Sequence, residues 1–111
     1  MYTLPEITPQ DMADLLVAAL EGGINYWADS AIPESWPSEA KYASDVLQFG
    51  AAITIQADGA DYTLTAENFE LGIRRAADHH GQSVRKFIDD HDSERADSAV
   101  QFAIFGELVY G

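Results

Sequence analysis

The sequence contains no cysteine, and this constrains the fold more than any other feature of the chain. It excludes disulfides, thiol catalysis and every zinc or iron–sulfur site that depends on cysteine. The fold must therefore be stabilised by burying apolar side chains, and hydrophobic residues make up 47% of the chain. Because 111 residues is close to the commonest size of a domain, we predict one domain over residues 1–111.

The lack of disulfides also favours the reducing cytoplasm. Residues Met1–Glu6 show no basic segment followed by an apolar stretch, so they do not resemble a signal peptide. No apolar run approaches the roughly 18 residues that a membrane span requires. We therefore expect a cytoplasmic protein with no membrane partner.

Capping residues and apolar spacing predict three to four helices. In the first, Thr8 is a favourable N-cap, Pro9 suits the first helical position, and Gly22 ends the apolar periodicity. The last helix is apolar around most of its circumference in its second half, which is typical of a buried helix. The predicted helices cover residues 9–21, a stretch from Thr65 to Gly81, a short turn around Val84, Phe87 and Ile88, and a stretch from about Ser93 to Gly106.

A β-hairpin is predicted in the middle of the chain. The segment Ala51–Gln56 shows an alternating pattern and is rich in β-branched residues, which is typical of a strand. Asp58-Gly59 is a turn pair, and Tyr62–Leu64 completes the second strand. Residues 30–40 contain two prolines and are expected to form a loop. Residues 41–49 stay open between helix and strand, with the helical pattern slightly cleaner.

Two short apolar and aromatic segments complete the pattern. Ile24–Ala28 fits either a strand or a turn of helix, and Leu108–Tyr110 is expected to add an edge strand. The fold class that follows is α+β. We expect a small single domain with about three to four helices around a buried C-terminal helix, together with a short β-hairpin or a small antiparallel sheet.

The charge is strongly negative and unevenly distributed. The chain has 19 acidic and 6 basic residues, a formal net charge of −13. Residues 1–73 contain 12 acids and one base, Lys41, so 1 − 12 = −11; residues 74–111 contain 7 acids and 5 bases, so 5 − 7 = −2. Such a surface repels nucleic acid and anionic lipid, so we expect no direct nucleic-acid binding. It attracts a basic partner, or else serves solubility alone.

The segment from Glu21 to Trp27 is the first candidate binding site. Its paired glycines allow a sharp turn and the close approach of a ligand. Asn25 offers donors and an acceptor, while Tyr26 and Trp27 offer flat surfaces for a planar ligand. The alternative is a helix end followed by two core aromatics. The glycine pair lacks the spacing and the lysine of a phosphate loop.

An acidic segment, Asp89–Glu94 with Asp97 beyond it, is the second candidate. Asp90, Asp92 and Asp97 would hold a divalent metal in a hydrolytic enzyme. The alternative is that Asp92 or Ser93 caps the next helix. An EF-hand does not fit, because the loop glycine is missing and the twelfth position from Asp90 is Gln101. We therefore predict no metal and no cofactor.

The third candidate is the only basic cluster. It would form an anion pocket, or its members would pair with nearby acids. His80 falls on an apolar helix face and His79 on the solvent side, and neither has a ligand spacing typical of metal sites. No nucleophile elbow, Cys–His pair or Rossmann fingerprint is present, so catalysis is not expected. The cluster consists of Arg74, Arg75, Arg85, Lys86 and Arg95.

Two stretches carry a resemblance to a known family. They are Ala19–Trp27, with the pattern LEGGxNYW, and Asp97–Gly111, chiefly Gln101 and the pattern FGExVYG. They resemble small uncharacterised proteins encoded by bacteriophages and prophages. The resemblance covers the two ends of the chain well and the middle poorly. It implies a phage accessory protein in the host cytoplasm, where small acidic phage proteins often counter host defences.

The prediction that follows is a non-enzymatic counter-defence protein with one of two mechanisms. In the first, it sequesters a small nucleotide-like ligand, which Asn25, Tyr26 and Trp27 bind. The phosphate is neutralised by Arg74, Arg75 or Arg95. In the second, the acidic surface of residues 1–73 inhibits a host defence protein by mimicking nucleic acid. A metal-dependent enzyme using Asp90, Asp92 and Asp97, a structural role in the virion, and self-association into a homo-oligomer stay open as alternatives.

Overall fold

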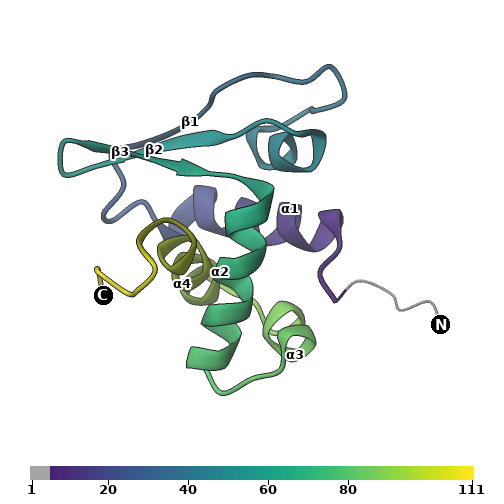
Figure 1. Ribbon diagram of the computed structural model, residues 1–111, viewed down its shortest axis with the longest axis vertical. Coiled ribbons are helices and arrows are strands. Elements are labelled where there is room, and N and C mark those ends of the chain that lie inside the picture. The colour runs from purple at the N-terminus through teal and green to yellow at the C-terminus, as the bar shows by residue number, and fades with distance from the viewer. Residues whose placement is uncertain (1–5) are drawn as a thin grey trace.

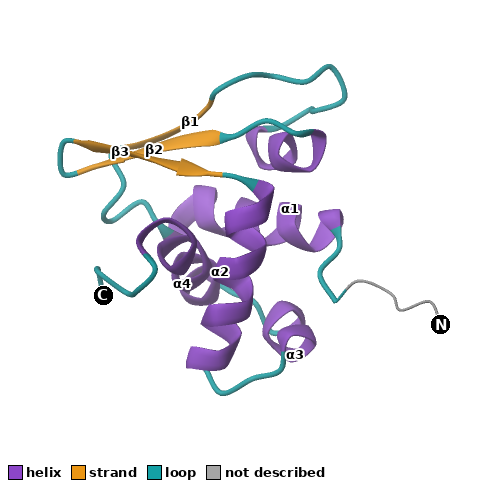
Figure 2. Ribbon diagram, viewed as in Figure 1, coloured by secondary structure: helices purple, strands orange, loops and turns teal. Residues whose placement is uncertain are grey.

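In the computed structural model, residues 6–111 are described, and a three-stranded antiparallel sheet lies with one face on a layer of helices (Figures 1 and 2). This is the predicted α+β class. The expectation that the N-terminal segment is no signal peptide falls mostly on residues outside the described part. Within residues 6–111, none of the helices has both the length and the apolar character needed to cross a membrane.

The helical layer follows the predicted caps. Thr8 and Asp11 form a reciprocal capping box at the first helix, and Thr65 does the same with Asn68 at the second. The first helix continues as a turn of π-helix that includes the glycine pair. The helical elements are α1 Pro9–Ala18, the π-helix η1 Ala19–Gly23, the 3-10 helix η2 Ala43–Phe49, α2 Ala66–His79, α3 Val84–Asp89 and α4 Ser93–Phe105.

The sheet contains β1 Ser30–Pro33, β2 Ile53–Ala57 and β3 Ala60–Leu64, in that order. The predicted hairpin is confirmed as β2 and β3. Its two-residue turn has positive φ angles at Asp58 (51°) and Gly59 (77°), as a tight hairpin requires.

The expectation of a loop over residues 30–40 is wrong for its first part, because β1 lies there. Pro33 is the last residue of an edge strand, a position where the missing N–H is tolerated, and this is why proline did not prevent pairing. The ambiguous residues 41–49 contain η2, which ends at Gly50 with φ 90°. Ile24–Ala28 forms a turn, in which the Trp27 and Ala28 amides donate to the carbonyl of Ile24.

The edge strand expected at Leu108–Tyr110 is wrong. The backbone N–H groups of Val109 and Tyr110 donate to the side chain of Gln101 and not to a neighbouring strand. The side-chain amide of Gln101 therefore accepts the backbone hydrogen bonds that a neighbouring strand would otherwise have accepted.

The strand register divides the sheet into an inner and an outer face. Ile53, Ile55 and Ala57 of β2 are buried against the helices. The outer face carries two cross-strand rows of side chains that point away from the helices. These rows are Ile32, Thr54 and Thr63, and Ser30, Gln56 and Asp61.

The last helix is central, as predicted, but its buried part is the first half. α4 packs mainly on α2 and also contacts α1, η1 and β3. Its buried stretch runs from Ala96 to Gln101, whereas Phe102–Phe105, the most apolar part, is only half-buried. The apolar pattern indicated burial of the second half of this helix. The first half is the buried part because its polar side chains contact groups from segments that are distant in sequence.

A glycine allows α2 and α4 to approach closely. A methyl group added at Gly72 would lie 2.3 Å from the carbonyl oxygen of Ala99 and 2.7 Å from the amide nitrogen of Ala103. Both obstacles are backbone atoms of α4, so neither can move aside without shifting the helix.

We predict that Gly72→Ala destabilises the protein by about 1–3 kcal/mol, because overpacking the helix interface must displace backbone. Urea unfolding followed by circular dichroism measures this change. Gly22→Ala is the matched control, since an added methyl group meets nothing within 4 Å there. Equal stability of the two variants would contradict the close packing.

Candidate functional site

A buried carboxylate, Asp97, organises the most polar part of the interior. Its side chain accepts three hydrogen bonds from uncharged groups. The Tyr26 hydroxyl donates to Oδ2 at 2.6 Å, and Trp27 Nε1 and Gln101 Nε2 donate to Oδ1 at 2.7 and 2.8 Å. Asp97 is only 9% exposed, and within residues 6–111 it takes part in no ion pair. Neutral donors therefore take the place of a counter-charge.

Gln101 lies one helical turn after Asp97 and fastens the C-terminal segment to α4. Its Oε1 accepts from the amides of Val109 and Tyr110 at 2.8 and 2.9 Å, and its Nε2 donates to the Tyr110 carbonyl at 3.1 Å. The two amides can only be satisfied by an oxygen, so they fix the orientation of the side-chain amide.

Trp27 is enclosed by aromatic side chains. Its ring stacks on Tyr110 with centroids 5.1 Å apart and planes within 3°, and Phe105 lies 5.5 Å away in a tilted arrangement. Only 7% of Trp27 is exposed. Tyr110 is also held by its hydroxyl, which donates to Asp58 at 2.5 Å. Trp27 is therefore part of the core, and its ring offers no open face to a planar ligand.

The glycine pair serves packing at one position only. A methyl group at Gly23 would lie 2.7 Å from the carbonyl oxygen of Ser93, so η1 and the start of α4 touch through backbone there. Gly22 has no such neighbour and faces solvent. The sequence suggested that a ligand approaches the glycine pair closely. In the structure, the start of α4 occupies that position at Gly23.

Tyr26 stands at the edge of a polar cleft, which we call the Tyr26 cleft. It has a volume of about 480 Å³ and lies between the end of η1, the first turns of α4 and the C-terminal segment. Tyr26 is 60% exposed although its hydroxyl is engaged with Asp97. The side chains that line the cleft include Tyr26, Glu94, Asp97, Gln101, Leu108 and Tyr110.

The remaining predicted ligand residues do not reach this cleft. Asn25 lines a separate hollow beside Ile24, Ala28 and Ala31. Arg75 is exposed on α2, near the end of α4. Arg74 pairs with Glu6 and Glu70, and Arg95 pairs with Asp92 and donates to Gln82.

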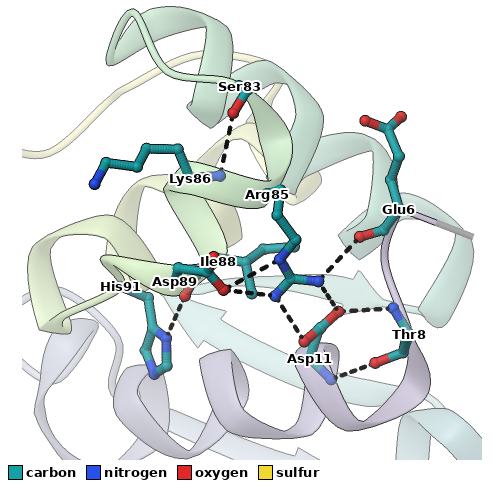
Figure 3. A network of polar contacts seen from close by, with 9 residues as sticks. All are labelled: Glu6, Thr8, Asp11, Ser83, Arg85, Lys86, Ile88, Asp89 and His91. Atoms are coloured by element: carbon teal, nitrogen blue, oxygen red, sulfur yellow. Dashed lines mark hydrogen bonds and ion pairs between the residues drawn. The ribbon is translucent and has the colours of Figure 1, made fainter.

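Arg85 has a structural role that links α3 to α1 (Figure 3). Its guanidinium forms two hydrogen bonds to Asp11, at 3.0 and 3.1 Å, and a third to Asp89 at 3.1 Å. Burial tends to raise the pKa of Asp11, but the bonds from Arg85 and Thr8 outweigh it and the pKa is lowered. Asp11 thus serves both the helix cap and the ion pair. Of the two interpretations of the basic cluster, ion pairing is the one seen for Arg74, Arg85, Lys86 and Arg95.

The aspartates proposed as metal ligands have separate partners. Asp90 pairs with Lys86 and accepts from Gln82, Asp92 caps α4, and Asp97 belongs to the buried network. Across residues 6–111, no group of three or more histidine, aspartate or glutamate side chains is arranged to hold a metal ion. The geometry gives the metal-dependent enzyme no support.

A second candidate region is the acidic sheet surface. We define it by five exposed acids on the strands of the sheet and in the segments that flank them, Asp29, Glu34, Glu39, Asp58 and Asp61. Two large apolar side chains in the same stretch of chain are also exposed, Ile32 at 59% and Trp36 at 57%. Ile32 belongs to the outer face of the sheet, opposite Thr54.

No family model matches the chain, and no curated protein and no solved structure matches it either. The resemblance to phage and prophage proteins therefore stays a prediction. The residues that carry it are nonetheless those of one structural unit, since Tyr26 and Trp27 from the first stretch meet Asp97, Gln101 and Tyr110 from the second.

The sequence does not reveal the hydrogen bonds that join the two ends of the chain. It shows Asp97 among acidic neighbours, while two of the partners of this side chain lie about seventy residues away. The spacing of four residues between Asp97 and Gln101 was the one signal available, because it places both side chains on one face of a helix.

We predict that Asp97→Ala destabilises the protein by about 2–5 kcal/mol, because the buried Trp27 and Gln101 donors lose their acceptor. Thermal and urea unfolding measure the loss. Asp78→Ala, which removes an exposed carboxylate of α2, is expected to change stability by no more than about 0.5 kcal/mol. Similar effects of the two substitutions would show that the network contributes nothing.

Two tyrosines are predicted to ionise late. Burial and then the hydrogen bond to Asp97 raise the pKa of Tyr26 to about 12, and the bond to Asp58, followed by burial, raises the pKa of Tyr110 to about 12. The stabilisation tied to these protons is complete below the ordinary pKa of 10.0 and is lost as pH rises through about 12. Ultraviolet titration should show both groups, with Asp97→Asn lowering only the pKa of Tyr26 and Asp58→Asn only that of Tyr110.

Proposed function

We propose that this chain is a non-enzymatic binding protein that docks, through its acidic sheet surface, on the basic face of a partner protein. The partner is of the kind that uses such a face to bind nucleic acid. The observation that carries the proposal is the distribution of acids without a counter-charge. Residues 29–67 contain seven acids and one base, Lys41, so 1 − 7 = −6. Among residues 6–111, none of these seven acids forms an ion pair.

The basic residues lie elsewhere and are largely neutralised. Arg74, Arg85, Lys86 and Arg95, on α2, α3 and α4, each pair with at least one acid. Residues 1–28 and 68–111 contain 12 acids and five bases, so 5 − 12 = −7. Six of those 12 acids form ion pairs, whereas none of the seven acids of residues 29–67 does so within residues 6–111. A surface of one sign steers a partner of the opposite sign and suppresses association with like-charged molecules.

Exposed apolar side chains supply anchors within this charged field. Trp36 and Ile32 are both more than half exposed, in a position where solubility alone would favour polar residues. Tryptophan is among the residues that contribute most to protein–protein interfaces when it becomes buried there. The combination of unpaired acids and two exposed apolar side chains in the same stretch of chain supports docking over a role in solubility alone.

Sequestration of a nucleotide-like ligand is less well supported. The phosphate would need a basic neighbour, and among residues 6–111 no basic side chain lines the Tyr26 cleft. Of the residues proposed to bind the base, only Tyr26 lines the cleft with its ring exposed. The counter-defence role and the host defence partner rest on the resemblance to phage proteins and stay predictions.

We predict that Glu34→Gln combined with Asp61→Asn weakens binding to a captured partner by about 2- to 30-fold, as expected for the loss of two exposed ion pairs. Partners are captured from bacterial lysate at low and moderate salt, identified by mass spectrometry, and their affinities measured with the purified proteins. Affinity should fall steeply as salt rises.

Asp78→Asn combined with Glu107→Gln is the matched control. It removes the same number of exposed charges from outside the acidic sheet surface, so it should leave the affinity within about twofold of the original. Equal weakening by both pairs would indicate that net charge alone is responsible. An affinity that does not change with salt would contradict docking through the acidic surface.

A further inference from the structure

The Tyr26 cleft is large enough for a small molecule and is not explained by docking through the sheet. Its volume of about 480 Å³ falls in the range of small-molecule sites. One side is polar, with Glu94 and Asp97 of α4. The other side includes Leu108 from the C-terminal segment, and Tyr26 stands at the edge with most of its ring exposed.

The hydrogen-bond donors around Asp97 are already used. Trp27 Nε1 has one hydrogen and gives it to Asp97, and the Tyr26 hydroxyl does the same. Gln101 has two amide hydrogens, which go to Asp97 and to the Tyr110 carbonyl. What these groups leave for a ligand is acceptor capacity on Asp97 Oδ2, which receives a single bond. The Tyr26 oxygen accepts one long bond, from Gln101 Nε2 at 3.4 Å. These groups therefore favour a ligand that donates hydrogen bonds.

The charge of the cleft selects the same class of ligand. Glu94 and Asp97 are both acidic, and no basic residue within residues 6–111 lines the cleft. Asp97 is nine-tenths buried and lacks a cationic partner, so its field is less screened than that of a surface carboxylate. An anion would be repelled, whereas an ammonium group would add the missing positive charge.

We propose that the Tyr26 cleft binds a small organic ammonium ion. The charged group lies between Glu94 and Asp97 and donates to their carboxylates. The exposed ring of Tyr26 borders the site and attracts a cation through its π-face. The alkyl part of the ligand packs on Leu108. This site is separate from the acidic sheet surface, and neither proposal depends on the other.

The test uses n-butylammonium chloride as the probe, with n-butanol as the uncharged analogue and butyrate as the anionic one. The readout is the indole N–H resonance of Trp27, whose nitrogen is bonded to Asp97 in the wall of the site. The resonance of Trp36, on the loop after β1, reports non-specific effects in the same spectrum. The expected result is a saturable shift of Trp27 with n-butylammonium alone.

Glu94→Gln is the decisive variant, because Glu94 is exposed and its substitution leaves the buried network intact. It should weaken n-butylammonium binding about two- to fivefold, while Asp78→Asn, with the same loss of charge on α2, leaves it unchanged. The proposal is overturned by an equal response to n-butanol, by tighter binding of butyrate, or by the absence of a saturable shift of Trp27. It is also overturned if Glu94→Gln binds n-butylammonium as tightly as the original protein. None of these outcomes bears on docking through the sheet.

Discussion

Asp97 accepts hydrogen bonds from Tyr26 and Trp27, in the turn after η1, and from Gln101, which in turn holds the C-terminal segment. A buried carboxylate without a cation is tolerated only when its oxygen atoms are well supplied with donors. The buried Asp97 carboxylate must be supplied with hydrogen-bond donors. This one requirement positions the turn after η1 directly and the C-terminal segment through Gln101. The Trp27 ring, which donates to this charge, is in turn held in place by stacking on Tyr110.

A second organising feature is the division of charge between the two layers. On the helical side, acids and bases meet across elements, and the Arg85–Asp11 pair joins α3 to the cap of α1. On the sheet side, the carboxylates have no such partners among residues 6–111. The first arrangement contributes to the cohesion of the helices, while the second leaves a field available to other molecules.

Local signals in the sequence predicted the elements whose stabilisation is local. Thr8 and Thr65 cap helices through side chains three residues away, and Asp58-Gly59 adopts the backbone angles of a tight turn. β1 was not predicted, because its partners in β2 lie twenty or more positions away in sequence and the prolines in this region favour a loop.

The candidate site was predictable only in part, for the same reason. Tyr26 and Trp27 were selected for their chemistry, but the sequence does not reveal that Tyr110 and Phe105 cover Trp27 while leaving Tyr26 open. The acidic sequence neighbours of Asp97 favour the interpretation of this residue as a metal ligand. Its actual role depends on donors that the fold brings from the other end of the chain.

The seven acids of residues 29–67 form no ion pair within residues 6–111, so no base beside them offsets their charge. Charges of one sign attract a positively charged body over about a Debye length, roughly 8 Å at physiological ionic strength, before the two surfaces touch. In the docking that we propose, these acids act during the approach, whereas the exposed Ile32 and Trp36 contribute only once the surfaces meet.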